Sequence, residues 1–174
     1  QYHYTESGFI KSRFIDDKAA VAAVFAVLED MKKTNRKPQY TTLFAFPLYE
    51  EIGHGGAYLP EDVSEYVALD IGLIGPDYCG SETKVSICAK DNYTPYDRAL
   101  TTKLIELAKA QELSYSVDVF YHYGTDASAA IRSGNNVYAA AFGMGCFASH
   151  GMERCHISSI VQTAKLLYAY LMSV

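Results

Sequence analysis

Segments with strand character and segments with helix character alternate along this chain, and this alternation constrains the fold more than any other feature. Apolar residues recur at helical spacing in four segments, which we expect to form helices: 18–33, 96–111, 126–132 and 158–172. Between them lie segments rich in β-branched and aromatic residues, which we expect to form strands: 40–47, 66–71, 84–89, 116–121 and 137–142. Strands that alternate with helices favour an α/β fold with a largely parallel sheet.

Length, charge and hydropathy narrow the class of protein. The 174 residues suit one domain, and 49% hydrophobic residues are enough to bury a core. The net charge of −5 and the lack of a lysine or arginine stripe in the sequence argue against a nucleic-acid partner. No apolar run in the sequence reaches the roughly 18–20 residues that a membrane-spanning helix needs, so we expect no membrane partner.

Four cysteines are present, and none forms a Cys-x-x-Cys pair: Cys79, Cys88, Cys146 and Cys155. Free cysteines are usually buried, and a disulfide framework is unusual in a chain with this much core. The spacings also do not suit a zinc site made of four cysteines. We therefore expect buried free thiols and a cytoplasmic protein.

Sheets of this kind bind ligands in the loops beyond the carboxyl ends of their strands. Several acidic residues and one histidine lie at such positions in this sequence. These residues lie at the end of a predicted strand, after one, or before a predicted helix: Asp16, Glu50, Glu51, Asp70 and His150. Four carboxylates that converge there repel one another unless a cation lies between them. Oxygen ligands together with imidazole suit zinc, cobalt or manganese, so the joint placement favours a metal site.

Each of these positions also has an ordinary structural explanation. Asp16 could cap the helix that follows it, and the two adjacent glutamates could form a solvated turn. Asp70 could belong to a turn, and a single loop histidine such as His150 is most often a surface residue. Spacing alone does not decide between these alternatives and the metal site.

Four short motifs are spread along nearly the whole chain and occur in this order: Ser12-Arg13-Phe14-Ile15-Asp16-Asp17, Glu50-Glu51-Ile52-Gly53-His54-Gly55-Gly56-Ala57, Gly124-Thr125-Asp126-Ala127 and Ala148-Ser149-His150-Gly151. The first three resemble the Ser-Arg-x-x-Asp-Asn/Asp, Glu-Glu-Val-Gly-x-x-Gly-Ala and Gly-Thr-Asp-Ala motifs of the tetrahedral aminopeptidases, metallopeptidase family 42, which includes the glutamyl and deblocking aminopeptidases. The fourth is similar to the histidine loop of one branch of that family. Each motif alone is a weak signal, whereas the four together in family order are specific.

The resemblance implies a three-layer αβα sandwich of the dinuclear zinc aminopeptidase type that binds two divalent ions, zinc or cobalt, with manganese as a further option. Asp16 would bridge the two ions, and Glu51 and His150 would complete the first site. Asp70 would bind the second ion. Glu50 would be the general base that takes a proton from a water molecule between the ions.

The sequence also departs from the family pattern. The His-x-Asp motif that supplies a further ligand to the second metal is absent from the chain. We therefore expect residues 1–174 to form a single domain that corresponds to the C-terminal portion of the catalytic domain, without the N-terminal strands and the inserted barrel-like domain. The Asp70 site would then lack one ligand, and the isolated chain would have little peptidase activity.

Three further residues are weaker candidates for binding the substrate. Thr125 and Asp126 could line the substrate cleft, although Asp126 also suits the N-cap of the predicted helix that starts there. His54 lies within the Glu-Glu motif and could contact substrate.

The leading functional hypothesis is an aminopeptidase that removes N-terminal residues from peptide substrates. A glycosidase with two acids is less suitable, because Glu50 and Glu51 are adjacent and cannot easily face each other across a sugar. A degenerate metallopeptidase-fold subunit that acts in assembly or binding remains the alternative. The resemblance also implies a homo-oligomer, which in this family is usually a tetrahedral dodecamer.

Overall fold

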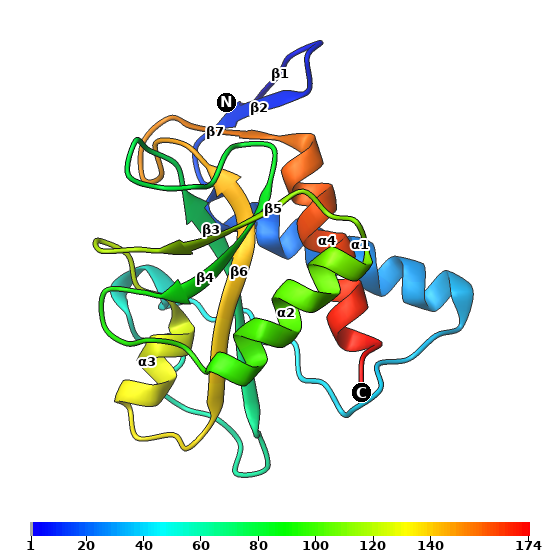
Figure 1. The fold of residues 1–174 in the computed structure, drawn as a ribbon, viewed down its shortest axis with the longest axis vertical. Helices are drawn as coiled ribbons and strands as arrows, with labels where there is room; N and C mark the ends of the chain where they lie inside the picture. The colour runs from blue at the N-terminus through cyan, green and yellow to red at the C-terminus, as the bar shows by residue number, and fades with distance from the viewer. Residues whose placement is uncertain (1) are drawn as a thin grey trace.

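The computed structural model describes residues 2–174 and contains a four-stranded sheet in the order β3-β6-β4-β5. The strands are β3 (Glu65–Leu73), β4 (Val85–Lys90), β5 (Tyr115–Val119) and β6 (Tyr138–Cys146) (Figure 1). β3 pairs with β6 in parallel and β4 pairs with β5 in parallel, whereas β4 and β6 are antiparallel. The expectation of a largely parallel sheet is thus corrected to two parallel pairs joined by an antiparallel contact.

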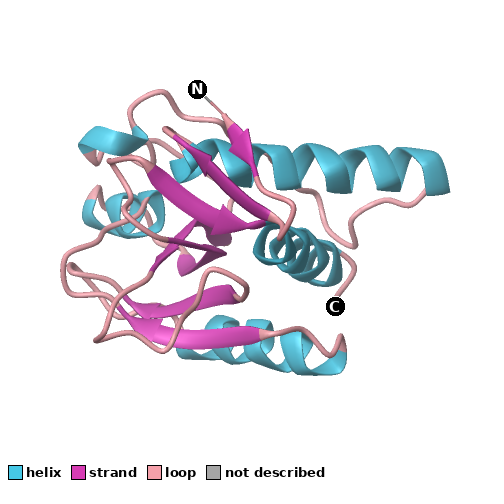
Figure 2. Ribbon diagram, turned by 90° about the horizontal axis from the view of Figure 1, so that it is seen from above, coloured by secondary structure: helices cyan, strands magenta, loops and turns pink. Residues whose placement is uncertain are grey.

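Helices cover both faces of this sheet, as Figure 2 shows. Three of them pack against one face: α1 (Ile15–Thr34), α2 (Arg98–Ala110) and α4 (Ile157–Leu171). The short helix α3 (Asp126–Arg132) packs against the other face. Along β6, Ala140 and Phe142 belong to the core under the three helices, while Ala139 and Ala141 belong to the core under α3. This alternation is the strand period of two, and it produces the expected three-layer αβα sandwich.

A second, three-stranded sheet joins β1 (His3–Tyr4), β2 (Phe9–Ser12) and β7 (Glu153–His156). These strands are too short to stand out in the sequence pattern, which does not predict them. β2 and β7 are antiparallel, and their register places Ser12 opposite Glu153. This pairing brings the start of α1 beside the end of the loop between β6 and β7.

The strand predicted over residues 40–47 is wrong: the segment is irregular and pairs with no strand among residues 2–174. Leu43 and Phe46 are exposed, and the ring of Phe46 stacks on that of Phe25 at a centroid distance of 5.7 Å. Strand propensity reflects the fit of a side chain to a pleated and partly buried surface. Here residues 43–47 line a cavity together with residues of β3 and do not pair with that strand, so the propensity does not produce a strand. The other predicted helices and strands are present within a few residues of their expected ends.

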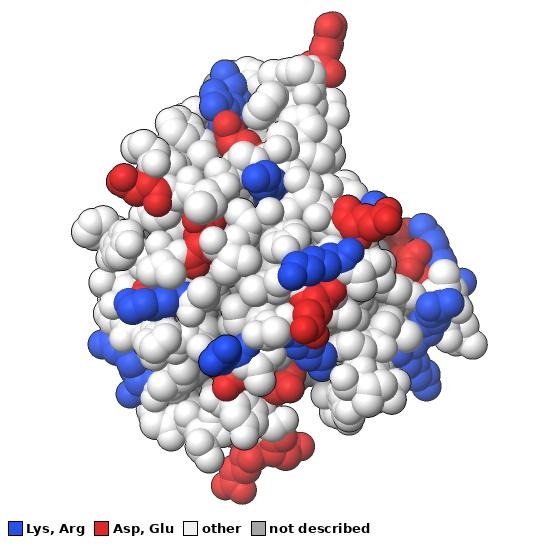
Figure 3. Space-filling model, viewed as in Figure 1, with Lys and Arg blue, Asp and Glu red and all other residues white. Residues whose placement is uncertain are grey.

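Three of the cysteines are buried free thiols as expected, but Cys79 is exposed. Cys79 lies in the loop between β3 and β4, where its backbone N–H donates to Asp118 and its side chain remains at the surface. On the face seen in Figure 3, basic and acidic side chains are interspersed among uncharged ones. Within residues 2–174, no helix combines the length and the apolarity that crossing a membrane requires.

Candidate metal centre

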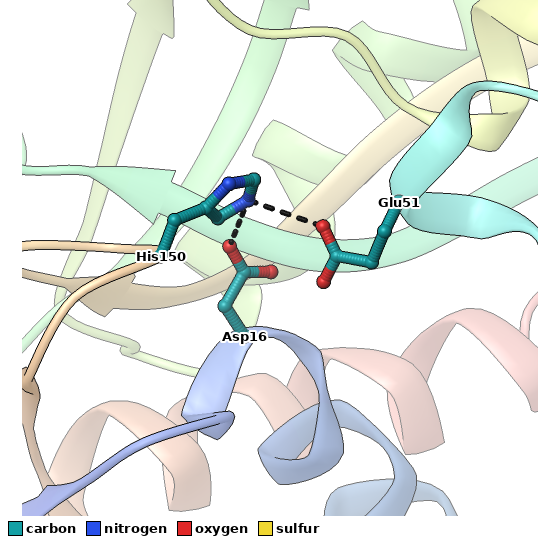
Figure 4. Close-up of side chains that lie close together, drawn as sticks. All are labelled: Asp16, Glu51 and His150. Atoms are coloured by element: carbon teal, nitrogen blue, oxygen red, sulfur yellow. Dashed lines mark ion pairs between the residues drawn. The ribbon is translucent and has the colours of Figure 1, made fainter.

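Three side chains from distant parts of the chain meet at one point (Figure 4). Asp16 comes from the start of α1, Glu51 from the 3₁₀ turn η1 (Glu50–Ile52), and His150 from the loop between β6 and β7. Nε2 of His150 lies 3.3 Å from Oδ2 of Asp16 and 3.1 Å from Oε2 of Glu51. The three residues offer ligand atoms that all lie within 4.8 Å of one another. The structure thus brings together three of the predicted metal ligands.

Asp16 is held at an irregular start of α1. The N-cap residue Phe14 has a left-handed backbone with φ 64°, and its own side chain makes no capping hydrogen bond. The peptide bond between Asp16 and Asp17 is cis. The alternative that Asp16 acts only as a helix cap is therefore not what the structure shows, and its carboxylate faces His150 instead.

The two glutamates of the short turn η1 differ in their surroundings. Gly53 ends the turn with a left-handed φ of 71°, which glycine adopts without strain, and its N–H donates to the carbonyl of Glu50. The Glu51 side chain is 54% exposed and points to His150. Glu50 is half-buried and lines the cavity described below. The two neighbours can therefore act on different groups.

Burial and mutual repulsion raise the pKa values of the carboxyl groups around this point. Burial, followed by repulsion from Glu51, raises the pKa of Asp16 to about 7. The pKa of Glu50 rises to about 8, first through burial and then through the charges of Asp126 and Asp17. Burial also raises the pKa of Asp70. These carboxyl groups need either protons or a cation, and two carboxylates with an imidazole suit a divalent ion such as zinc.

Asp70 lies near this cluster but outside it. It occupies the interior of β3 and is 5% exposed, and its Oδ1 accepts a hydrogen bond of 2.6 Å from the N–H of Ile71. Asp70 lines the same cavity as Asp16 and Glu50. Its role as ligand of a second ion stays a prediction.

A cavity of about 590 Å³ opens beside the cluster. Its wall includes all five residues of the predicted metal and base set, together with Thr125. A smaller neighbouring cavity is lined by Glu50, Asp70 and Asp126. The volume of the larger cavity suits a small ligand, because ligand pockets commonly span about 300–1,000 Å³.

The weaker candidates lie in three different settings. Thr125 lines the large cavity and caps α3, because its Oγ1 accepts a hydrogen bond from the N–H of Ala127. The N-cap is therefore Thr125, and the expectation that Asp126 caps this helix is corrected. Asp126 lies against the backbone of Gly55 and Gly56, whose hydrogen bonds partly offset the effect of burial on its pKa. His54 is exposed, packs near Tyr49 and lines neither cavity.

Sequence reasoning missed three acidic residues near the site: Asp17, Asp91 and Glu153. Asp17 lines the smaller cavity, and burial raises its pKa to about 6. Asp91 is fully buried, and its carboxylate accepts hydrogen bonds from the chain around it, including the N–H of Thr125. Glu153 is 2% exposed and bonds to the backbone of two cluster residues. No sequence signal identifies Glu153, because Glu153–His156 is a strand of only four residues without an alternation of apolar and polar side chains.

Comparison of the sequence with known proteins identifies the family to which the chain is similar. Residues 1–166 match the sequence model of the family described as M42 glutamyl aminopeptidase. The Bacillus subtilis (strain 168) protein YhfE, whose name proposes an aminopeptidase, is 44% identical over 170 residues, which cover 97% of this chain and 49% of that protein.

Solved structures show the same fold. The dodecamer PhTET1-12s superimposes with a TM-score of 0.86 at 22% identity, over 100% of this chain and 54% of the other. The Pyrococcus horikoshii TET1 peptidase, which can assemble into a tetrahedron or a large octahedral shell, gives a TM-score of 0.81 at 22% identity, over 100% of this chain and 54% of that one. The chain spans about half the length of the relatives it matches.

Proposed function

Because the chain belongs to the M42 glutamyl aminopeptidase family, we propose that it forms the metal-binding part of an aminopeptidase. The reaction is hydrolysis of the N-terminal peptide bond of a peptide. The single observation that carries this proposal is the convergence of Asp16, Glu51 and His150 on one point beside a cavity.

These three side chains would hold a divalent ion, zinc or cobalt, with manganese as a further option. Such an ion, when bound, polarises a carbonyl oxygen and lowers the pKa of a water molecule. Asp16 is the least exposed of the three ligands, with a side chain that is 8% exposed, and it anchors the site to α1. Glu51 and His150 approach from the solvent side.

Glu50 is the general base of this proposal. It lines the cavity next to the cluster, where a carboxylate can accept a proton from a water molecule and return it. It would take a proton from the attacking water and pass it to the amine that leaves. Its neighbour Glu51 faces His150, so the two glutamates do not compete for one role.

A second ion is the less complete part of the proposal. Asp70 would bind this second ion, and Asp16 would bridge it to the first. The chain supplies no His-x-Asp motif to complete that site. Since the relatives are about twice as long, we propose that residues 1–174 are a single domain equivalent to the C-terminal portion of the catalytic domain. The isolated chain would then bind one ion well and turn over slowly.

A residue of the cavity wall suggests which N-terminal side chain the substrate carries. Arg132 lines the cavity, and its guanidinium lies 4.2 Å from the centre of the Tyr93 ring. A cation held in this way would favour peptides with an acidic N-terminal side chain. This preference agrees with the word glutamyl in the family description. Thr125 would line the same substrate pocket.

The proposal also covers the oligomeric state of the protein and its location in the cell. The PhTET1-12s relative is a dodecamer, so we propose a homo-oligomer for the protein that contains this chain. Three buried free thiols agree with the reducing cytoplasm. Peptides are the proposed partners.

The test is a metal titration combined with an assay. Metal-free chain is titrated with Co²⁺ and Zn²⁺, and hydrolysis of aminoacyl-p-nitroanilides is measured with each metal and with a chelator. We expect one tight ion per chain and slow hydrolysis that the chelator abolishes and that Glu50→Gln lowers by about 10²–10⁴-fold without loss of metal. Absence of metal binding would overturn the hydrolase assignment, and full turnover by the chain alone would show that the missing ligand is dispensable.

A further inference from the structure

Glu153 connects the two segments that carry Asp16 and His150. It lies in β7 and is 2% exposed. Its Oε2 accepts a hydrogen bond of 3.0 Å from the backbone N–H of Asp16. Its Oε1 accepts one of 3.1 Å from the backbone N–H of His150. One buried carboxylate thus binds the main chain of both residues.

We propose that Glu153 is a positioning residue that fixes the distance between the Asp16 and His150 side chains and so sets the affinity of the metal site. This role rests on the function proposed above. Glu153 is not itself a ligand in this proposal, because it lies outside the cluster of three ligands and each of its oxygens accepts a backbone hydrogen bond.

Both segments need a partner that their own sequence does not provide. The N-cap residue of α1, Phe14, makes no side-chain hydrogen bond, and the carboxylate of Glu153 in β7 instead accepts the N–H of Asp16. His150 has a left-handed backbone with φ 65°, which is sparsely populated for a residue other than glycine. Such a conformation persists where surrounding contacts hold it, and the bond to Glu153 is one of them.

The backbone of Glu153 is itself firmly held. Its strand pairs with β2, where Ser12 lies opposite Glu153. The next residue, Arg154, exchanges two backbone hydrogen bonds with Phe147. The carboxylate is therefore attached to a fixed point between the two segments, which a mobile surface glutamate could not offer.

The proposed role requires a carboxylate of this length. Glutamine would turn an NH₂ group toward one of the two N–H donors, so one hydrogen bond would be replaced by a contact between donors. Aspartate is shorter by one methylene and could not reach both segments. Loss of partners that orient metal ligands typically costs about 10–100-fold in metal affinity.

The test compares Glu153→Gln with Glu82→Gln in the metal-free chain. Glu82 is a matched control, because it is a neighbouring carboxylate that pairs with Arg154 and contacts neither ligand segment. Affinity for Co²⁺ is measured by calorimetry and by the cobalt absorption spectrum, and the melting temperature is measured without metal. We expect Glu153→Gln to bind Co²⁺ about 10–100-fold more weakly with an altered spectrum, and Glu82→Gln to bind it as the wild type does.

Amide hydrogen exchange of the wild-type chain provides a second measurement if the variant fails to fold. The amides of Asp16 and His150 should exchange more slowly than that of the neighbouring Ser149. Equal exchange at these amides, or wild-type cobalt affinity in Glu153→Gln, would overturn the role of Glu153. A lower melting temperature with unchanged affinity would also overturn it, because that result describes a purely structural residue. Failure of the wild type to bind Co²⁺ would instead overturn the proposed function.

Discussion

Nε2 of His150 lies 3.1 Å from Oε2 of Glu51, although one residue belongs to the loop before β7 and the other to a turn between α1 and β3. Neither side chain is buried, and each comes from a loop or a short turn. Exposed ion pairs contribute only about 0–1 kcal/mol, so attraction between the two charges does not explain their approach. The proposed metal ion, bound by both side chains and by the buried carboxylate of Asp16, would account for this approach.

The first prediction concerns the ligand set. His150→Ala should weaken Co²⁺ and Zn²⁺ binding by more than the roughly 10–100-fold that loss of an orienting partner causes, because a direct ligand is removed. His3→Ala is the control, since His3 is an exposed histidine outside the cluster. Calorimetric titration of both variants measures the effect. Equal affinities in the two variants would show that His150 is a surface histidine only.

The second prediction concerns the pH dependence of stability without metal. The pKa values of Asp16 and Glu50 rise in the folded chain to about 7 and about 8, so the folded state binds more protons than the unfolded state at intermediate pH. Their contribution to stability is fully present below the pKa values of the unfolded chain, near pH 4, and is lost as the pH rises through about 7–8.

Urea unfolding of the metal-free chain at pH 5 and pH 9 measures this slope. Glu50→Gln removes one of the titrating groups, so it should lose less stability between the two pH values than the wild type does. Added Zn²⁺ should stabilise the wild type more at the higher pH, because metal ligands bind in their deprotonated form. A wild type that gains stability from pH 5 to pH 9 without metal would contradict the prediction.

The third prediction concerns Asp91, which holds the loop that leads to Thr125. Its carboxylate accepts hydrogen bonds from the N–H groups of Tyr93, Thr94 and Thr125 and from the hydroxyl of Tyr96. Asp91→Ala should destabilise the fold by about 2–4 kcal/mol, because several buried donors lose their acceptor.

The control for this prediction is Asp97→Ala, which removes the N-cap of α2 and should cost only about 1 kcal/mol. Denaturant unfolding compares the two variants. Equal losses of stability would mean that the fully buried network around Asp91 contributes no more than a single helix cap.

The fourth prediction concerns substrate choice. Arg132→Ala should lower kcat/KM for glutamyl-p-nitroanilide by about 10-fold, and leave that for leucyl-p-nitroanilide nearly unchanged, because a charged contact of about 1–2 kcal/mol is lost for the acidic side chain alone. The ratio of the two rates is the measurement. A parallel fall for both substrates would assign Arg132 to the structure of the cavity wall.

Residue order alone is enough to predict most of the helices and strands and to propose the ligand set. Helical spacing identifies α3 over its full length, and apolar runs locate β3 and β6. The acidic motifs around Glu50 and Asp16 carry their chemistry in residue type, so the order of residues is sufficient to recognise them. These features are local, and local periodicity is what a sequence reports directly.

Which residues meet, and how they are held, follows instead from the folded arrangement. The fold pairs β2 with β7, leaves residues 40–47 without a strand partner, and gives the helix cap to Thr125 in place of Asp126. It also places Glu153 between the backbones of Asp16 and His150. These outcomes depend on contacts between segments far apart in the chain, whose free energy comes from packing and from shared hydrogen-bond partners that no local pattern encodes.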